Sequence, residues 1–464
     1  MPIDAHMREI DSFSWSMERD PLLRMPIVAV ALLDGAADAT RLTARLDRLT
    51  RAVPMFRQRV VETPLRLAPP KWVVDPDFDL SWHVRRVGAP SPGTFAAVLD
   101  LARQFGTAAF DPVRPLWECT LVDGIENGRS ALIIKVHHTL TDGVGGMQLL
   151  LHVFDLSVEG TDLGAALDPP PPGEVSVSIL DALTFDTHQT FDVARSVAGT
   201  LLGAVRRPRS TATRLVGTAR SVAEVLAPAN QLLSPVMTRR GLGRRYDTID
   251  VPLEQLRQAG RVAGGTVNDA FLGAVTGGLR RYHEQHGKPV ERLRATFPIS
   301  VRAADDPEEG NRIALVRYVV PVGIADPVER IQADQERAEH WKHAPALPHM
   351  EGIAGTVNRL PAGYLQGLAK HVDFVASNVP GFPFPVFCAG APLVGFYPFS
   401  PTGGSAVNVT LLSYRDTCNI GVNSDVLAVP DGAVFLSCLQ AGFDEVLALA
   451  DREAAGREVK VRSS

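Results

Sequence analysis

Short runs of apolar residues alternate with segments of helical periodicity along this chain. Residues 27–33 form an uninterrupted apolar run, and residues 131–136 form another that is broken only by Lys135. Both have the length of strands buried inside a protein. Residues 37–53 place leucines on one side of a helix and arginines on another, and helical spacing returns over 94–105. The chain therefore mixes buried strands with amphipathic helices.

A polar motif follows the second apolar run. Residues 137–143 read HHTLTDG, and residues 147–154 then return to apolar residues at helical spacing. The two histidines of the motif, His137 and His138, therefore lie where a strand ends and a helix begins. At such a position a rigid scaffold presents side chains to a ligand.

Length and proline content predict two lobes. A chain of 464 residues is too long for one ordinary core, and the four successive prolines at 169–172 can continue neither a helix nor a central strand. We predict an N-terminal lobe over 1–167 with the histidine motif, a proline- and arginine-rich helical linker over 168–245, and a C-terminal lobe over 246–464.

One helix of the second lobe has a clear predicted start. Thr266 precedes a run of helical spacing and is a suitable N-cap, because its hydroxyl can accept a hydrogen bond from a backbone N–H of the first turn. Asn268 and Asp269 then fall in that first turn. The strands predicted within 294–302 and 313–322 should lie in a sheet.

Composition narrows the class of protein. The 47 basic and 52 acidic residues give a net charge of −5, which argues against a nucleic-acid binder. The four cysteines have neither CxxC spacing nor the density of a secreted disulfide scaffold, so reduced thiols in the cytoplasm are the simpler interpretation. The N-terminus lacks the pattern of a signal peptide, and no stretch approaches the ~20 consecutive apolar residues that span a bilayer. Any membrane association is expected to be peripheral.

One segment departs from the weakly acidic average. Residues 204–245 contain nine arginines and one acidic residue, Glu224, so the local excess is nine minus one, or +8. The segment suits a surface that rests on anionic lipid head groups or attracts phosphate-bearing ligands. A solvated linker face explains the same composition, and the sequence leaves the two interpretations open.

His138 is suited to proton transfer near neutral pH. An unperturbed histidine has a pKa of about 6.5, so it can take a proton from a substrate and return it. Asp142, four residues on, could orient a ring or the loop, and Gly143 permits a backbone geometry that a Cβ would disfavour.

Three other interpretations of the pair are open at this point. A shared metal ion is disfavoured because neighbouring strand residues point to opposite faces. A serine hydrolase is disfavoured because the chain has no GxSxG elbow. A buried histidine satisfied by backbone groups remains a good description of His137, which we expect to support His138.

The motifs together resemble a known family. HHxxxDG at 137–143 is similar to the motif of CoA-dependent acyltransferases and of nonribosomal peptide synthetase condensation domains. Pro115-Leu116-Trp117 resembles the PLW motif, and Asn268-Asp269 the ND motif, of the bacterial wax ester synthase/acyl-CoA:diacylglycerol acyltransferase family. Further matches lie at 75–83, 378–381 and 408–414, so the resemblance covers nearly the whole chain.

The resemblance implies an α/β fold of two lobes like chloramphenicol acetyltransferase, each lobe a mixed sheet with helices, and an active-site tunnel between them. By that analogy His138 deprotonates the hydroxyl of diacylglycerol or a long-chain alcohol, and the alkoxide attacks the thioester of acyl-CoA. Acyl-CoA is a co-substrate in this chemistry. Neither a metal nor a separate cofactor is implied.

Roles for the other motif residues follow from the same resemblance. Asn268 would donate to the oxyanion or position a loop, with helix capping as the alternative, and Asp142 would be structural. The PLW residues 115–117, Asp269 and Glu18 would line or support the substrate site, although Glu18 is only a weak match. Two departures bear on acceptor preference and tunnel shape, namely Met25-Pro26 in place of Met-His and Phe382 in place of a second proline after NVPG.

The leading hypothesis is therefore a cytoplasmic O-acyltransferase that makes triacylglycerol, peripheral at the inner membrane face or at lipid droplets through residues 204–245. Wax ester synthesis is the alternative within the family, and amide formation of the condensation type is disfavoured because no carrier-attachment segment accompanies the domain. From another class, the chain could bind acyl-CoA or lipid without catalysis. Acyl-chain length, acceptor identity and oligomeric state are left open by the sequence.

Overall fold

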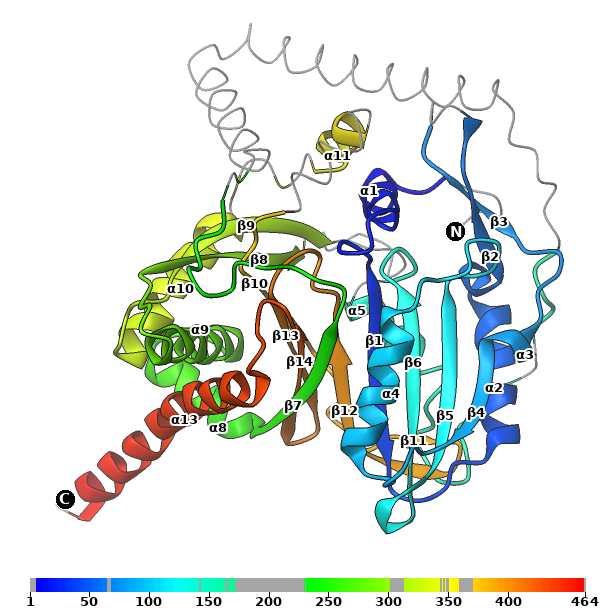
Figure 1. Ribbon diagram of the computed structural model, residues 1–464. Helices are drawn as coiled ribbons and strands as arrows, with labels where there is room; N and C mark the ends of the chain where they lie inside the picture. The colour runs from blue at the N-terminus through cyan, green and yellow to red at the C-terminus, as the bar shows by residue number, and fades with distance from the viewer. Residues whose placement is uncertain are drawn as a thin grey trace, which may run out of the picture.

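Two six-stranded sheets form the frame of the protein (Figure 1). The computed structural model describes residues 6–64, 68–141, 143–162, 164, 167–171, 229, 231–300, 313–342, 344, 347, 350–358 and 370–462, and the structural statements below refer to these. The first sheet has the strand order β11-β12-β1-β6-β5-β4 and the second β7-β14-β13-β10-β8-β9. The predicted α/β fold of two mixed sheets with helices is confirmed.

The N-terminal lobe contains four strands of the first sheet and a separate two-stranded ribbon. Its sheet contains β1 (Pro26–Leu33), β4 (Val84–Gly88), β5 (Trp117–Ile125) and β6 (Arg129–His137), and β2 (Gln58–Val61) and β3 (Lys71–Val74) form a separate ribbon. The helices are α1 (Glu9–Met17), α2 (Ala39–Ala52), α3 (Leu80–His83), α4 (Phe95–Thr107) and α5 (Gly143–Leu150). The predicted strands at 27–33 and 131–136 are thus β1 and β6, adjacent at the centre of the sheet.

The first sheet is completed by strands from far along the chain. β11 (Phe387–Cys388) and β12 (Ala391–Phe399) belong to it, and β12 pairs antiparallel with β1 so that Phe399 lies opposite Val28. The predicted C-terminal lobe over 246–464 is therefore not one continuous unit. The apolar pattern of 391–399 indicates a buried strand, but a local pattern carries no information about which sheet the strand joins.

The second sheet carries a layer of helices on its outer side (Figure 1). Its strands are β7 (Arg244–Pro252), β8 (Arg292–Ser300), β9 (Ile313–Pro321), β10 (Phe374–Val379), β13 (Val407–Tyr414) and β14 (Thr417–Asp425). The helices are α8 (Leu253–Val262), α9 (Val267–Gln285), α10 (Pro327–Lys342), α11 (Met350–Asn358) and α13 (Gly432–Arg462). Of these, α11 contacts α1 of the N-terminal lobe, where the Asn358 amide donates to the Glu9 carboxylate at 2.8 Å.

One described helix is long and apolar enough to cross a membrane by length and composition alone, over Gly432–Asp451 of α13. Its apolar side chains lie in the core of the C-terminal lobe, where Phe443 faces Phe271 of α9 at a ring distance of 6.2 Å and Leu439 is fully buried. This packing is that of a core helix.

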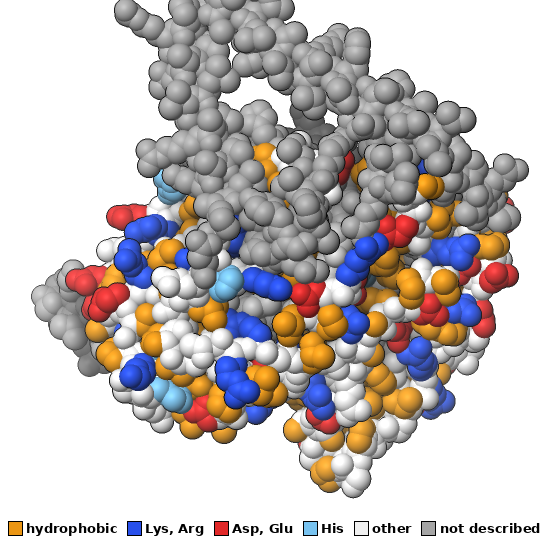
Figure 2. Space-filling model, turned by 45° about the horizontal axis from the view of Figure 1, so that its top comes forward, with side chains coloured by type: hydrophobic (Ala, Val, Ile, Leu, Met, Phe, Trp, Pro, Cys, Tyr) orange, Lys and Arg blue, Asp and Glu red, His pale blue; other side chains and the backbone are white. Residues whose placement is uncertain are grey.

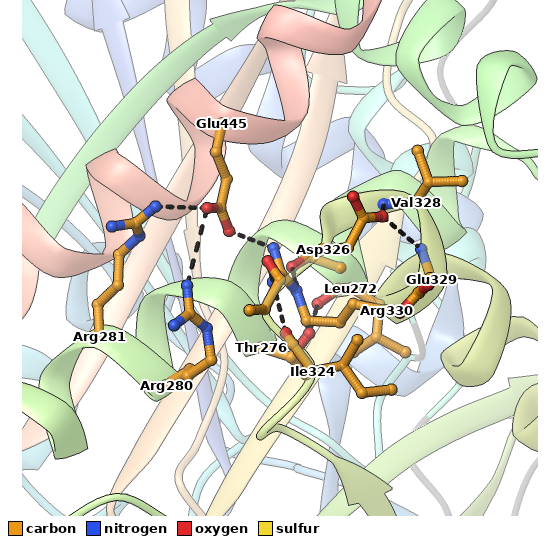
Figure 3. Close-up of polar contacts among 12 residues, drawn as sticks. Leu272, Thr276, Arg280, Arg281, Ile324, Asp326, Val328, Glu329, Arg330 and Glu445 are labelled. Carbon is orange, nitrogen blue, oxygen red and sulfur yellow. Dashed lines mark hydrogen bonds and ion pairs between the residues drawn. The ribbon is translucent and has the colours of Figure 1, made fainter.

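A partly buried ion cluster joins three helices of the outer layer (Figure 3). The Glu445 carboxylate of α13 contacts Arg280 and Arg281 of α9 and Arg330 of α10. Arg330 is fully buried, and its guanidinium also donates to the carbonyl oxygens of Gly273 and Ile324, each at 2.9 Å. One carboxylate therefore holds α9, α10 and α13 together.

Asp334 of α10 is buried in the same layer with incomplete hydrogen bonding. One of its oxygens lies 3.1 Å from the hydroxyl of Thr276, and the other has no hydrogen-bond partner among the described residues. Burial raises the pKa of this carboxyl to about 8. The folded protein therefore holds a proton on Asp334 at neutral pH that the unfolded chain releases near pH 4.

Asp334→Asn should make the protein more stable at alkaline pH. Between pH 4 and 8 the folded state binds one more proton than the unfolded state, so wild-type stability falls as pH rises, by at most about 1.4 kcal/mol per pH unit. The amide cannot ionise. Denaturant unfolding at pH 5, 7 and 9 should show a margin of the variant over wild type that grows with pH. Glu329→Gln, which removes a charge from the exposed side of the same helix, is the matched control, and a margin for Asp334→Asn that stays constant with pH would contradict the assignment.

Candidate active site

The histidine pair is fixed by backbone hydrogen bonds on both sides. β6 ends at His137, whose N–H donates to the carbonyl of Leu116 at 3.0 Å. The N–H of His138 donates to the carbonyl of Met25 at 3.1 Å. The PLW segment and the Met25-Pro26 segment, far apart in the sequence, therefore flank the pair.

The ring of His137 is locked in one tautomer. It is fully buried, and its Nδ1 accepts a hydrogen bond from the backbone N–H of Thr139 at 3.2 Å. A backbone N–H can only donate, so the ring proton is on Nε2. Nε2 lies 3.0 Å from the Glu18 carboxylate and donates to it. His137 thus has both nitrogens occupied, as expected for a supporting residue rather than a base.

Glu18 links the ring of His137 to the backbone of Met25. The same Oε1 that accepts from His137 also accepts from the N–H of Met25 at 2.7 Å. Burial opposes ionisation of Glu18, but the hydrogen bonds from His137 and the Met25 N–H, with the charge of Arg24, hold the pKa of the carboxyl below its ordinary value. The described contacts give Glu18 a positioning role, and its predicted contact with substrate stays a prediction.

Glu18→Gln should lower kcat about tenfold while leaving KM for acyl-CoA within about twofold. The amide oxygen keeps the shape of the acceptor but loses the charge that strengthens both hydrogen bonds. Steady-state kinetics of thiol release measure both constants. Glu62→Gln is the matched control, because Glu62 also contacts the α1 region through Trp15 but is exposed. An equal loss in the two variants would contradict the role of Glu18.

His138 is half-buried where His137 is fully buried. Of the two it is the residue accessible to a substrate, as a general base requires. Gly143 begins α5, directly after the turn. Asp142 lies outside the described residues, so its predicted orienting role is not addressed by the structure.

The PLW residues are buried and support the histidine turn. Trp117 begins β5 and its Nε1 donates to the carbonyl of Phe56 at 2.8 Å. The ring of Trp117 stacks on His83 at 4.5 Å, and Nδ1 of His83 donates to the Trp117 carbonyl at 2.7 Å. Pro115 and Leu116 are buried. These contacts suit a supporting role, and the predicted contact of residues 115–117 with substrate stays a prediction.

His83 is the last residue of the segment 75–83 that matches the family. It is fully buried, and its Nε2 has no hydrogen-bond partner among the described residues. Burial lowers the pKa of the His83 ring, so the ring is neutral. It stacks on Trp117 and also on Phe78, the latter at a ring distance of 5.3 Å.

The ND motif divides into a capping residue and an exposed one. Thr266 is the N-cap of α9, as predicted, and Asp269 completes a capping box by accepting from the Thr266 N–H at 2.8 Å. This carboxylate is buried and occupied in starting the helix, and the predicted substrate-binding role of Asp269 stays a prediction. Asn268 is exposed. α9 packs on other helices of the C-terminal lobe and on β10, and no described contact brings Asn268 to the histidine turn.

Two arginines at the described end of the arginine-rich segment are bound within the protein. The guanidinium of Arg240 donates to the carbonyl oxygens of Gly404 and Val372 at 2.8 and 2.9 Å, and Arg244 pairs with the buried Asp425 at 3.3 Å. Burial lowers the pKa of both arginines. Neither the lipid-binding nor the solvated interpretation holds for these two residues. Residues 204–228 lie outside the described part of the chain. On the face in Figure 2, basic and acidic side chains are interspersed over the described surface.

Both departures from the family pattern have a place in the structure. Pro26, which replaces the histidine of the pattern, begins β1 opposite His137. Met25 before it bonds Glu18 and His138 through its backbone. Phe382 is buried and packs edge-on against Phe154, a residue shortly after α5, at a ring distance of 6.0 Å. Phe382 therefore packs in the core near the end of α5, the helix that follows the histidine motif.

Comparison with known proteins agrees with these motifs. Residues 1–271 match the model of the wax ester synthase/diacylglycerol acyltransferase catalytic domain, and residues 309–446 match that of the C-terminal domain of the same family. A Mycobacterium tuberculosis protein named as a diacylglycerol O-acyltransferase is 38% identical over 444 residues, which are 93% of this chain and 90% of the relative. Another from that organism, Tgs1, is 28% identical over 474 residues, 97% and 98% of the two chains.

Solved structures share the fold. The wax ester synthase/diacylglycerol acyltransferase of Marinobacter aquaeolei superposes with a TM-score of 0.63 at 22% identity, covering 96% of this chain and all of the other. The first condensation domain of the calcium-dependent antibiotic synthetase superposes with a TM-score of 0.62 at 13% identity, covering 97% and 96%. At these identities the similarity establishes the two-lobed fold.

Proposed function

Since the chain belongs to the wax ester synthase/diacylglycerol acyltransferase family, it is an acyl-CoA-dependent O-acyltransferase, and we propose that His138 is the base that activates the acceptor. The curated relatives are named for diacylglycerol as acceptor, which makes triacylglycerol the product. The observation that carries this proposal is the division of labour in the pair, with His137 held by Glu18 and Thr139 and His138 accessible at the same turn.

In this reaction His138 takes the proton of the acceptor hydroxyl as its oxygen attacks the thioester carbonyl. The tetrahedral intermediate then collapses, the C–S bond breaks, and the proton on His138 passes to the departing CoA sulfur. No covalent enzyme intermediate and no cofactor are needed, since acyl-CoA supplies an activated acyl group. Asn268, exposed at the start of α9, remains the proposed oxyanion donor on the strength of the motif alone.

One assay separates the acceptor classes and tests for turnover. Purified protein is incubated with palmitoyl-CoA and either diacylglycerol or hexadecanol, and released thiol is followed. Faster release with diacylglycerol supports triacylglycerol synthesis, and faster release with hexadecanol favours wax ester synthesis. Binding of palmitoyl-CoA with no release for either acceptor would contradict the enzyme and favour a lipid-binding protein.

The protein is proposed to work in the cytoplasm, peripheral to the inner membrane face or to lipid droplets, because the acceptor is dissolved in lipid. Contact would involve the five arginines at 206, 207, 209, 214 and 220, since Arg240 and Arg244 are occupied inside the protein. Flotation of the full chain with phosphatidylglycerol vesicles tests this. Replacing the five arginines with serine should release the protein, and unchanged flotation would contradict the contact.

A further inference from the structure

One end of α1 contacts the histidine pair. The ring of Trp15 packs edge-on against the ring of His137 at 5.6 Å, and Glu18, the residue after the helix, accepts from its Nε2 at 3.0 Å. The same oxygen of Glu18 accepts from the N–H of Met25, whose carbonyl accepts from the N–H of His138. The position of α1 and of the turn after it therefore determines how both histidines are held.

The other end of α1 is bonded to the C-terminal lobe. α11 lies beside α1 (Figure 1), and the side-chain amide of Asn358 donates to both the carbonyl oxygen and the carboxylate of Glu9, each at 2.8 Å. Glu9 is 6% exposed. A Cβ on Gly355 would lie 3.2 Å from the carboxyl carbon of Glu9, so a side chain there would crowd the carboxylate. The two helices are thus in close contact at the first residue of α1.

The turn after α1 has two further contacts with the C-terminal lobe. Val357 of α11 is 4% exposed and packs on buried apolar residues of α1 and the turn, namely Met17, Leu23 and Met25. In the same turn the carboxylate of Asp20 lies 3.6 Å from the ammonium of Lys370. Both contacts reach the turn that places Glu18, and the first reaches Met25 directly.

These contacts are not needed to hold the two lobes together. β11 and β12, which come from the second half of the chain, already join the lobes by completing the first sheet. What the contact of α1 with α11 adds is a connection between the C-terminal lobe and the histidine turn. A displacement of about 1 Å at a catalytic group can lower the rate about 10²-fold, so this connection should affect turnover.

We propose that Val357 and Asn358 of α11 are positioning residues for acyl transfer, which fix the turn of His137 and His138 through α1 and Met25. Where it predicts turnover, this inference rests on the proposed function. Where it predicts how firmly the histidine turn is held, it is tested without any reaction.

The first test changes the amide between α1 and α11 in the full chain. Asn358→Asp places a carboxylate against that of Glu9, so kcat for thiol release should fall about tenfold with KM for palmitoyl-CoA within about twofold. Glu9→Gln in the same chain supplies an amide that can donate to the new carboxylate, and kcat should recover to within about threefold of wild type. Gln332→Ala removes an amide of α10 that donates to the carbonyl of Ala263. It is the control and should leave kcat unchanged.

Val357→Ala tests the apolar contact. The smaller side chain leaves a cavity beside Met25, so both the melting temperature and kcat should fall, kcat by about fivefold. Val320→Ala truncates a fully buried valine of β9 in the same lobe. This control should lower the melting temperature and leave kcat unchanged.

Hydrogen exchange measures the histidine turn without turnover. The N–H of His138 donates to the carbonyl of Met25, so peptides that span His138 should exchange at least about fivefold faster in Asn358→Asp and in Val357→Ala than in wild type. Peptides of β5 should exchange at the wild-type rate. Adding Glu9→Gln to Asn358→Asp should restore slow exchange at His138.

Two outcomes would overturn the inference. One is wild-type kcat and wild-type exchange at His138 in both Asn358→Asp and Val357→Ala. The other is a lower melting temperature with unchanged exchange at His138, which would make the contacts purely structural. If wild type itself releases no thiol, the proposed function fails, and the exchange rates alone then decide the inference.

Discussion

Replacing His138 with alanine is expected to lower kcat for acyl transfer by about 10²- to 10⁴-fold, the range that a positioned general base contributes. The variant should fold normally, because the backbone N–H of residue 138 still donates to Met25 and the half-buried ring leaves no large internal cavity. Thiol release from palmitoyl-CoA with the preferred acceptor measures the loss, and thermal unfolding checks the fold. Added imidazole should recover part of the activity.

Two further variants test whether the loss of activity is specific to His138. His152→Ala removes a half-buried histidine on the turn after α5 and should leave kcat near the wild-type value. His137→Ala should lower both kcat and the melting temperature, since it empties a buried site bonded to Glu18 and Thr139. Full activity of His138→Ala would assign the base elsewhere, whatever the effect at His137.

Replacing Glu445 with leucine is expected to lower the free energy of unfolding by about 3–5 kcal/mol, the range measured when one partner of a buried ion pair is removed. Arg330 is fully buried and would keep its charge without a carboxylate, and Arg280 and Arg281 would lose the same partner (Figure 3). Denaturant unfolding monitored by circular dichroism gives the difference.

A second substitution distinguishes loss of the pair from loss of packing. Arg330→Met combined with Glu445→Leu removes the uncompensated charge, so most of the lost stability should return. Glu254→Leu breaks the pairs with Arg257 and Arg261 on the exposed side of α8 and should cost no more than about 1 kcal/mol. A loss at Glu445 as small as that at Glu254 would show that the cluster does not hold the helices together.

Local pattern was enough to predict the elements that carry the site. The runs at 27–33 and 131–136 are strands because their residues are buried on both faces, and Thr266 caps α9 because its hydroxyl lies next to free N–H groups. The placement of His137 and His138 at the end of a strand followed from the same reasoning.

Contacts between distant residues could not be predicted in the same way. The Glu18 carboxylate meets His137 across 119 positions, and α1 gives no sign of that partner in its own sequence. β12 joins the first sheet although it follows four strands of the second sheet, β7, β8, β9 and β10, along the chain. One signal was visible in the chain, namely Lys135 inside an apolar strand, since a charge in such a place requires a buried partner.

Because β12 pairs with β1, the first sheet can be completed only late in the synthesis of the chain. Until residues 391–399 leave the ribosome, β1 is an edge strand whose apolar residues and unpaired backbone groups are open to association with other chains. β1, whose first residue Pro26 lies opposite His137, thus acquires its second neighbour only after five-sixths of the protein has been made. A nascent or truncated chain therefore contains the histidine motif long before it has a closed sheet to hold it.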